Sequence, residues 1–282
     1  MPEGDSVFVL ARRLRSALDG HRLVDGETRS GAGAGSSLAG LTVVGHDTHG
    51  KHLLTRFDDG RSLHTHLRMQ GSWTVTGVGK RLPRRLLPEV RVRMATAGGA
   101  TAYGLDLPVV ELLRTRDERE VIGHLGPDPL RSDWNADAAI RRLRVMGDRP
   151  AVAALLDQRG MSGLGNLWVN ELCFLRGVWP WSPIASLDLP RLVALAARTL
   201  RHSATVAGAY QVTTGSARRD ESHWVVGRAG RPCLRCRTTV LVDAGIPDDA
   251  ERRRTWWCPR CQPEPSRPGA RRLVTGAPPR GA

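Results

Sequence analysis

The chain has 282 residues, which is long enough for two modest domains with apolar cores. It lacks both a run of about 18 uncharged apolar residues and a basic leader, so we expect no membrane partner, no secretory signal and a cytoplasmic location. Its 42 lysines and arginines outnumber its 28 acidic residues, and the formal net charge of +14 favours a polyanion such as nucleic acid as the partner, although a basic surface can also serve solubility alone.

The first predicted element begins almost at the N-terminus. Residues 4–18 place apolar side chains at helical spacing after an Asp-Ser start, and Gly20 supplies a stop signal, so we predict an amphipathic helix there. From residue 21 to about 113 the pattern changes to short alternating runs such as HLLTRF and SLHTHL. Residues 58–60, Asp-Asp-Gly, are typical of a hairpin turn between two such runs. This stretch therefore predicts a β-sandwich.

The next part of the chain is predicted to be mainly helical. A turn-rich stretch, residues 126–134, has the composition of a linker between domains. Helical periodicity then returns in four stretches, which cover residues 133–146, 151–158, 166–175 and 189–207. Cys173 lies alone in the third of these, where we expect it to act as a small buried hydrophobic residue.

A glycine-rich segment interrupts this helical part. Residues 159–166, RGMSGLGN, contain three glycines and end on Asn166, which opens the next predicted helix. Glycines let a backbone approach a ligand closely, and the free amides at a helix start suit a phosphate. The side chain of Asn166 would add a further donor. The alternative is an ordinary glycine-rich connection capped by asparagine.

Four of the five cysteines form two CxxC pairs with 21 residues between them, Cys233 with Cys236 and Cys258 with Cys261. Thiolates at this spacing can face one tetrahedral ion, whereas disulfides are unusual in a reducing compartment. We therefore predict one structural Zn²⁺ on a β-hairpin over residues 228–262. Four thiolates close the coordination sphere, which leaves no position for an activated water. Residues 263–282 have the composition of a disordered basic tail.

The order of the motifs is that of a known family. MPEGD at the start, GKHLL around Lys51, LLDQRGMSGLGNLWVNE, and CLRC followed by RRRTWWCPRCQ resemble the formamidopyrimidine-DNA glycosylase and endonuclease VIII family over about residues 1–262. The resemblance implies an α+β fold with a catalytic β-sandwich domain and flanking helices, a helix-two-turn-helix domain that binds DNA, and a zinc finger. The corresponding ranges are residues 1–125, 126–227 and 228–262, followed by the tail at 263–282.

The resemblance gives the N-terminus a chemical role. Family members lose the initiator methionine, and the amine of the proline, here Pro2, attacks C1′ of a damaged nucleotide in DNA. An internal proline nitrogen is an unreactive amide, whereas a terminal one is a secondary amine. The family's acid, here Glu3, protonates the opening sugar and later shuttles protons. The implied protein is a monomeric DNA glycosylase of the nucleoid that also nicks the strand by β,δ-elimination.

Three side chains are implied to hold phosphates. Lys51 occupies the position of the family's β-hairpin lysine, Asn166 matches its phosphate clamp, and Arg253 matches its zinc-finger arginine. Arg252 and Arg254 are alternatives in register, because three arginines run together and the planar fork of any of them can grip a phosphate.

Two residues are implied to fill the space that a flipped nucleotide leaves in the duplex. Met69, in HLRMQG, matches the family's wedge methionine or leucine between two strands, and Gln70 would contribute beside it. An unbranched apolar side chain suits this task. The alternative for Met69 is a buried methionine on a strand.

Three departures from the oxidised-purine enzymes of the family bear on the substrate. Those enzymes begin MPELPE, carry a DPRRFG-like segment and have a lysine shortly before the glycine turn, whereas this chain has MPEGD, GLDLPVVELL and AVAALLDQ at these places. The comparison favours endonuclease VIII and oxidised pyrimidines. The alternatives are an 8-oxoguanine or formamidopyrimidine glycosylase, and a zinc-finger protein that binds DNA without catalysis.

Overall fold

The computed structural model describes residues 2–218, 220–246, 249 and 251–265, so most of the predicted tail lies outside the described residues. The N-terminal part contains α1 (Gly4–Leu18), β1 (Leu23–Thr28), β2 (Val43–His49), β3 (His52–Phe57), β4 (Arg61–His66), β5 (Ser72–Thr76), η1 (Arg84–Glu89), β6 (Val90–Thr96), β7 (Thr101–Leu105), β8 (Val109–Arg114), η2 (Thr115–Asp117) and α2 (Glu118–Ile122). The remainder contains α3 (Ala136–Arg144), α4 (Ala151–Leu156), α5 (Asn166–Arg176), η3 (Ile184–Ser186), α6 (Leu189–Thr205), β9 (Leu241–Ala244) and β10 (Arg254–Trp257).

The strands of the N-terminal part form two antiparallel sheets of four strands each. One sheet has the order β1-β6-β7-β5 and the other β2-β3-β4-β8. Side chains that alternate along these strands, among them Leu53, Leu63 and Val92, are buried in one apolar core. Residues 58–60 form the turn between β3 and β4, where Gly60 has a φ of +79°. The predicted β-sandwich and its hairpin turn are confirmed.

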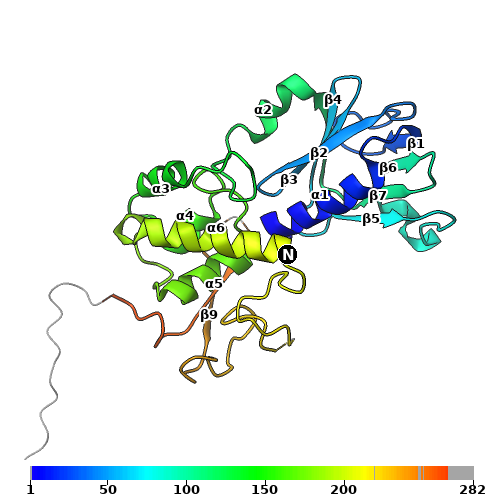
Figure 1. Ribbon diagram of the computed structural model, residues 1–282. Coiled ribbons are helices and arrows are strands. Elements are labelled where there is room, and N and C mark those ends of the chain that lie inside the picture. The colour runs from blue at the N-terminus through cyan, green and yellow to red at the C-terminus, as the bar shows by residue number, and fades with distance from the viewer. Residues whose placement is uncertain (1, 219, 247–248, 250, 266–282) are drawn as a thin grey trace, which may run out of the picture.

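Helix α1 connects the sandwich to the helical part of the molecule. Its buried residues Val7, Leu14 and Leu18 belong to the core of the sandwich. The start of the helix contacts the other part, because the backbone N–H of Gly4 donates to the carbonyl of Gly163 over 2.8 Å. Figure 1 shows α1 lying between the strands and α6. The N-terminal residues are therefore held between two bodies of the fold.

The helical part has an apolar core of its own. Trp168, Leu172, Val193 and Leu200 are buried there, contributed by α5 and α6. Cys173 is also fully buried, as predicted. No helix among the described residues is both long enough and apolar enough to cross a membrane. The four predicted helical stretches correspond to α3, α4, α5 and α6.

The predicted linker is a tightly bonded junction. Asp128 accepts a hydrogen bond of 2.7 Å from the backbone N–H of Gly50, and the ring of His49 is 2.8 Å from the carbonyl of Gly126. Arg131 donates to the carboxylate of Asp47 over 3.1 Å. Turn-rich composition predicted a connection here but could not reveal these long-range bonds. They fix the turn between β2 and β3 against the helical part.

Candidate active site

Glu3 lies buried where α1 meets α5. Its carboxylate accepts hydrogen bonds from the backbone N–H groups of Gly165 at 2.7 Å, Leu167 at 2.8 Å and Trp168 at 3.4 Å. A carboxylate is stabilised here by the positive end of the α5 dipole. The sequence predicted a phosphate at this helix start, but in the structure these amides are occupied by Glu3.

The glycine-rich turn allows this close approach. A Cβ atom on Gly165 would lie 2.4 Å from the carboxyl carbon of Glu3, and one on Gly4 would lie 2.7 Å from Cα of Gly163. Side chains at these positions would force the two segments apart. The glycines of residues 159–166 therefore serve contact with a residue of the same chain.

Burial makes the Glu3 carboxyl an unusually weak acid. It raises the pKa of this carboxyl to about 7, against the opposing effects of the Lys51 ammonium and of the backbone N–H donors. A carboxyl with such a pKa is part protonated at neutral pH. It can therefore give a proton to a reacting group and take it back later.

Lys51 is the second residue of the tight turn, Gly50 and Lys51, that joins β2 to β3. Gly50 has a φ of +57° in this turn, and its N–H is the group that Asp128 holds. Burial lowers the pKa of the Lys51 ammonium, while the nearby Glu3 carboxylate acts in the opposite direction. Asp128 was missed by the sequence analysis, where its only signal was an acid in a turn-rich stretch.

Four of the predicted residues line one cavity of about 370 Å³: Pro2, Lys51, Met69 and Arg253. Residues that are far apart in the sequence thus open on a common space. The remaining wall is formed by other side chains, namely His52, His64, His66, Arg68, Val109 and Glu251. The cavity therefore brings Pro2, the predicted nucleophile, close to several cationic side chains.

The lining of this cavity shows which of the three consecutive arginines faces the site. Of Arg252, Arg253 and Arg254, only Arg253 is among the lining residues. Its Nε and Nη2 donate to the two carboxylate oxygens of Asp249 over 2.9 and 2.6 Å. This side-on pairing leaves Nη1 with no hydrogen-bond partner among the described residues, and it raises the pKa of the guanidinium. The sequence analysis did not single out Asp249.

Asn166 has a structural partner that was not foreseen. It is 4% exposed, and its side-chain amide donates to the carbonyl of Arg254 over 3.0 Å. Its Oδ1 accepts from the amide of Asn170 over 3.1 Å. Asn166 therefore ties α5 to β10, and its contact with a phosphate stays a prediction.

Met69 lies in the turn between β4 and β5 and is 58% exposed. The alternative of a buried strand methionine is therefore wrong. Gln70 follows it and is also exposed, but it is not among the lining residues of the cavity. An exposed apolar side chain at the edge of a basic cavity is suited to contact with bases.

The four paired cysteines come together on the hairpin of β9 and β10. Their sulfur atoms all lie within 4.8 Å of one another, with 4.0 Å between Cys233 and Cys261 and 3.3 Å between Cys236 and Cys258. Tetrahedral Zn–S bonds of about 2.3 Å place sulfurs about 3.8 Å apart. The residues therefore fit the predicted zinc ion, and the predicted grouping of the cysteines is confirmed.

Comparison with known proteins agrees with this arrangement. Residues 1–108 match the family described as formamidopyrimidine-DNA glycosylase N-terminal domain, and residues 125–213 match the corresponding H2TH domain. A protein of Streptomyces coelicolor named "Probable endonuclease 8 2" is 45% identical over 99% of this chain and 100% of its own length. The chain belongs to the formamidopyrimidine-DNA glycosylase family. It is accordingly a DNA repair enzyme of the glycosylase and abasic-site lyase class.

Within the family, this glycosylase is closer to endonuclease 8. "DNA-(apurinic or apyrimidinic site) lyase Nei2" of Mycolicibacterium smegmatis is 39% identical over 93% of the chain and 99% of that relative, whereas a formamidopyrimidine-DNA glycosylase of Geobacillus kaustophilus is 32% identical over 80% of the chain and 83% of that relative. Lactococcus lactis Fpg, solved with N7-benzyl-Fapy-dG DNA, has a TM-score of 0.74 at 23% identity, covering 93% of this chain and all of that one. That structure supports the fold.

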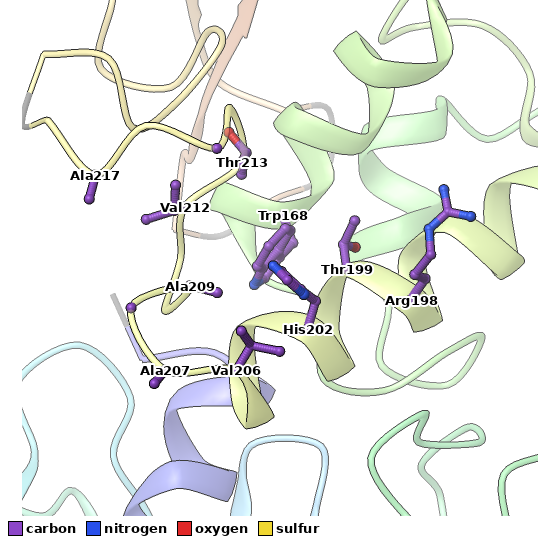
Figure 2. A pocket seen from close by; sticks show the side chains of 12 residues that line it. Trp168, Arg198, Thr199, His202, Val206, Ala207, Ala209, Val212, Thr213 and Ala217 are labelled. Atoms are coloured by element: carbon purple, nitrogen blue, oxygen red, sulfur yellow. The ribbon is translucent and has the colours of Figure 1, made fainter.

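A second cavity, of about 490 Å³, lies between α6 and the segment that follows it (Figure 2). Trp168, Thr199, His202 and Thr213 contribute to its wall. None of the predicted site residues lines it. The first cavity, which Pro2 lines, is therefore the candidate active site.

Proposed function

We propose that the enzyme removes oxidised pyrimidines from DNA through a Schiff base on Pro2 and then nicks the strand by β,δ-elimination. The observation that carries this proposal is the common cavity of Pro2, Lys51 and Arg253, with the raised pKa of the buried Glu3 beside it. All of these side chains come from one copy of the chain, which supports a monomer. The substrate places the enzyme with the nucleoid.

The chemistry begins once Met1 has been removed. The nitrogen of Pro2 is then a secondary amine, and α-amino groups titrate at about pH 8, so a useful fraction is neutral. This nitrogen attacks C1′, the base leaves, and Glu3 protonates the ring oxygen of the sugar as it opens. Loss of the C2′ proton then expels the 3′ phosphate, and a second elimination expels the 5′ phosphate.

The remaining side chains hold the substrate in place. Lys51 and the free Nη1 of Arg253 supply positive charge to the phosphates beside the lesion. The exposed Met69 enters the space that the flipped nucleotide leaves. The cysteine cluster, when it binds zinc, holds the hairpin that carries Arg253 in shape and has no open position for chemistry.

The preference for oxidised pyrimidines rests on the sequence and on the relatives. Residues 104–113 replace the family's DPRRFG-like segment and form the end of β7, a tight turn and most of β8. They offer neither the arginine nor the phenylalanine of that segment. A formamidopyrimidine-type preference is the second candidate, supported by the match to that family.

A panel of lesion duplexes tests this preference. Strand nicking at thymine glycol, dihydrouracil, 8-oxoguanine and an abasic site is measured under single turnover. We expect the abasic site and the two pyrimidine lesions to react at least about tenfold faster than 8-oxoguanine, a margin of about 1.4 kcal/mol in barrier height. Faster removal of 8-oxoguanine than of both pyrimidines would contradict the assignment.

Replacing Glu3 with glutamine separates base removal from strand nicking. The amide cannot give a proton to the opening sugar, so we expect base removal to fall by about 100-fold or more, within the range for general acid catalysis. Nicking of a preformed abasic site, whose sugar already opens in water, is expected to retain far more activity. Rates on thymine glycol and abasic duplexes measure the two steps. Equal losses on both duplexes would contradict the role of Glu3.

The raised pKa of Glu3 also predicts a pH profile. The productive state needs a protonated Glu3, lost as pH rises through about 7, and a neutral Pro2 amine, lost as pH falls through about 8. Base removal should therefore peak at about pH 7.5 and fall on both sides. Nicking of abasic DNA by Glu3→Gln should lack the alkaline fall. An alkaline fall that persists in this variant would show that another group causes it.

A further inference from the structure

A row of histidines lies on the face of the β2-β3-β4-β8 sheet that points away from the sandwich core. His52 on β3 lies directly opposite His66 on β4, and His64 lies opposite Glu111 on β8. Their neighbours Leu53 and Leu63 point to the sandwich core, so side chains of the alternate positions lie on the other face. The row begins at the cavity that Pro2 lines and ends at Glu111, whose side chain is 41% exposed.

Hydrogen bonds connect three members of this row. Nδ1 of His52 is 2.8 Å from Nε2 of His64, and Nδ1 of His64 is 2.8 Å from a carboxylate oxygen of Glu111. The carboxylate only accepts, so Nδ1 of His64 carries a proton and donates it. In a neutral His64, Nε2 is then an acceptor, and Nδ1 of His52 must donate to it. Nε2 of a neutral His52 then carries a lone pair, which has no hydrogen-bond partner among the described residues.

His66, a third imidazole in the cavity wall, has the opposite arrangement of its two ring nitrogens. Nδ1 of His66 accepts a hydrogen bond of 3.0 Å from the backbone N–H of Arg68, so Nε2 of a neutral His66 carries its proton. His66 can donate to a phosphate but cannot accept a proton at Nε2. Glu251, a carboxylate in the same wall, is 3.6 Å from the guanidinium of Arg253. His52 is thus the imidazole whose free nitrogen can serve as a base.

We propose that His52 takes the C2′ proton in the elimination step and that His64 and Glu111 carry the charge away to solvent. The proposal rests on the proposed Schiff base at Pro2. The C2′–H bond breaks and its proton goes to Nε2 of His52, while the bonding electrons form the C1′–C2′ double bond and neutralise the iminium nitrogen. Expulsion of the 3′ phosphate then restores a conjugated iminium.

His52, His64 and Glu111, here called the relay, keep a positive charge from building up in this cavity. Burial, and then the neighbouring imidazoles, lower the pKa of His52 to about 2, and Lys51, Arg68 and Arg253 line the same space. An imidazolium is strongly disfavoured there. As Nε2 gains the C2′ proton, Nδ1 passes its proton to His64, and His64 passes its own to Glu111. The final state replaces an exposed carboxylate by a carboxylic acid, which then loses its proton to water.

The test uses the full chain and separates adduct formation from elimination. Single-turnover reactions with abasic duplex are stopped with borohydride, and both the trapped adduct and the nicked strand are followed. In His52→Gln we expect the adduct to form within about twofold of the wild-type rate and then to accumulate, while nicking slows at least about tenfold. Glu111→Gln, which changes an exposed side chain, should also slow nicking. The matched control is His124→Gln, because the ring of His124 lies 6.3 Å from that of His52 but takes no part in the hydrogen bonds that join His52, His64 and Glu111.

Chemical rescue provides a readout that a purely structural role would not move. Added imidazole should restore nicking to His52→Ala, because a free base can occupy the vacated space, and it should leave the wild type unchanged. Wild-type nicking rates in His52→Gln would overturn the proposal. A parallel fall of adduct and nicking, without rescue, would also overturn it. Failure of the wild type itself to form any adduct would instead overturn the proposed function.

Discussion

Replacement of Pro2 by glycine is expected to remove most of the activity of the enzyme on damaged and abasic DNA. A secondary amine condenses with the sugar to a permanently charged iminium, whereas the primary amine of glycine gives a neutral imine unless it is protonated. The charge acidifies C2′, and the proline ring also fixes the direction of attack. Loss of both the charge and the positioning should slow nicking by about 100-fold or more.

Binding of DNA should survive the same change. The proposed phosphate contacts come from Lys51 and Arg253, which the substitution leaves unchanged. We expect Pro2→Gly to bind a duplex with an uncleavable abasic analogue within about threefold of the wild-type affinity, measured by fluorescence anisotropy at one stated salt concentration. A variant that nicks abasic DNA at the wild-type rate would show that another amine is the nucleophile.

The second large effect concerns the cysteine cluster. Cys258→Ser removes one of four sulfurs that lie within 4.8 Å of one another, and a structural zinc site contributes directly to folding. The hairpin that it holds carries Arg253, and Asn166 bonds to the neighbouring carbonyl of Arg254. We therefore expect zinc content and DNA affinity to fall together, the affinity by about tenfold or more.

Cys173→Ser provides the control for this experiment. Cys173 is fully buried in the helical core and is not one of the four clustered cysteines. The variant should therefore keep about one zinc ion per chain by elemental analysis even where its stability falls. Unchanged zinc content in Cys258→Ser would contradict the four-thiolate site. Lost zinc with unchanged DNA affinity would contradict the role of the hairpin.

Local signals in the sequence were sufficient for most elements of the fold. The helix predicted over residues 4–18 coincides with α1, and the run HLLTRF coincides with β3. Cys173 is buried as its apolar neighbours indicated. These features depend on periodicity and turn chemistry within one segment, which a single sequence carries directly.

The contacts that build the site could not be predicted in the same way. The glycine-rich turn suggested a bound phosphate, but its partner is the carboxylate of Glu3, more than 160 residues earlier in the chain. Asp128 holds the turn that contains Lys51, and it does so from a stretch that looked like a linker. Such pairings depend on how distant segments pack, and nothing in the local pattern specifies them.

Residues that position another side chain could not be predicted from the sequence either. Asp249 is four residues from Arg253, but only the structure reveals the side-on pairing that leaves one edge of the guanidinium free. The histidines at 52 and 64 lie in strands that read as ordinary alternating runs. Their hydrogen-bonded order appears only when β3, β4 and β8 are placed side by side.

The most direct measurement is the trapping of the enzyme on abasic DNA, with its first residue established by intact mass. Preparations that begin at Pro2 should form a borohydride-reduced adduct with the duplex, and peptide mapping should place the bond at the nitrogen of Pro2. Preparations that retain Met1 should form none. Absence of an adduct in protein that begins at Pro2, or a bond at Lys51 instead, would contradict the account.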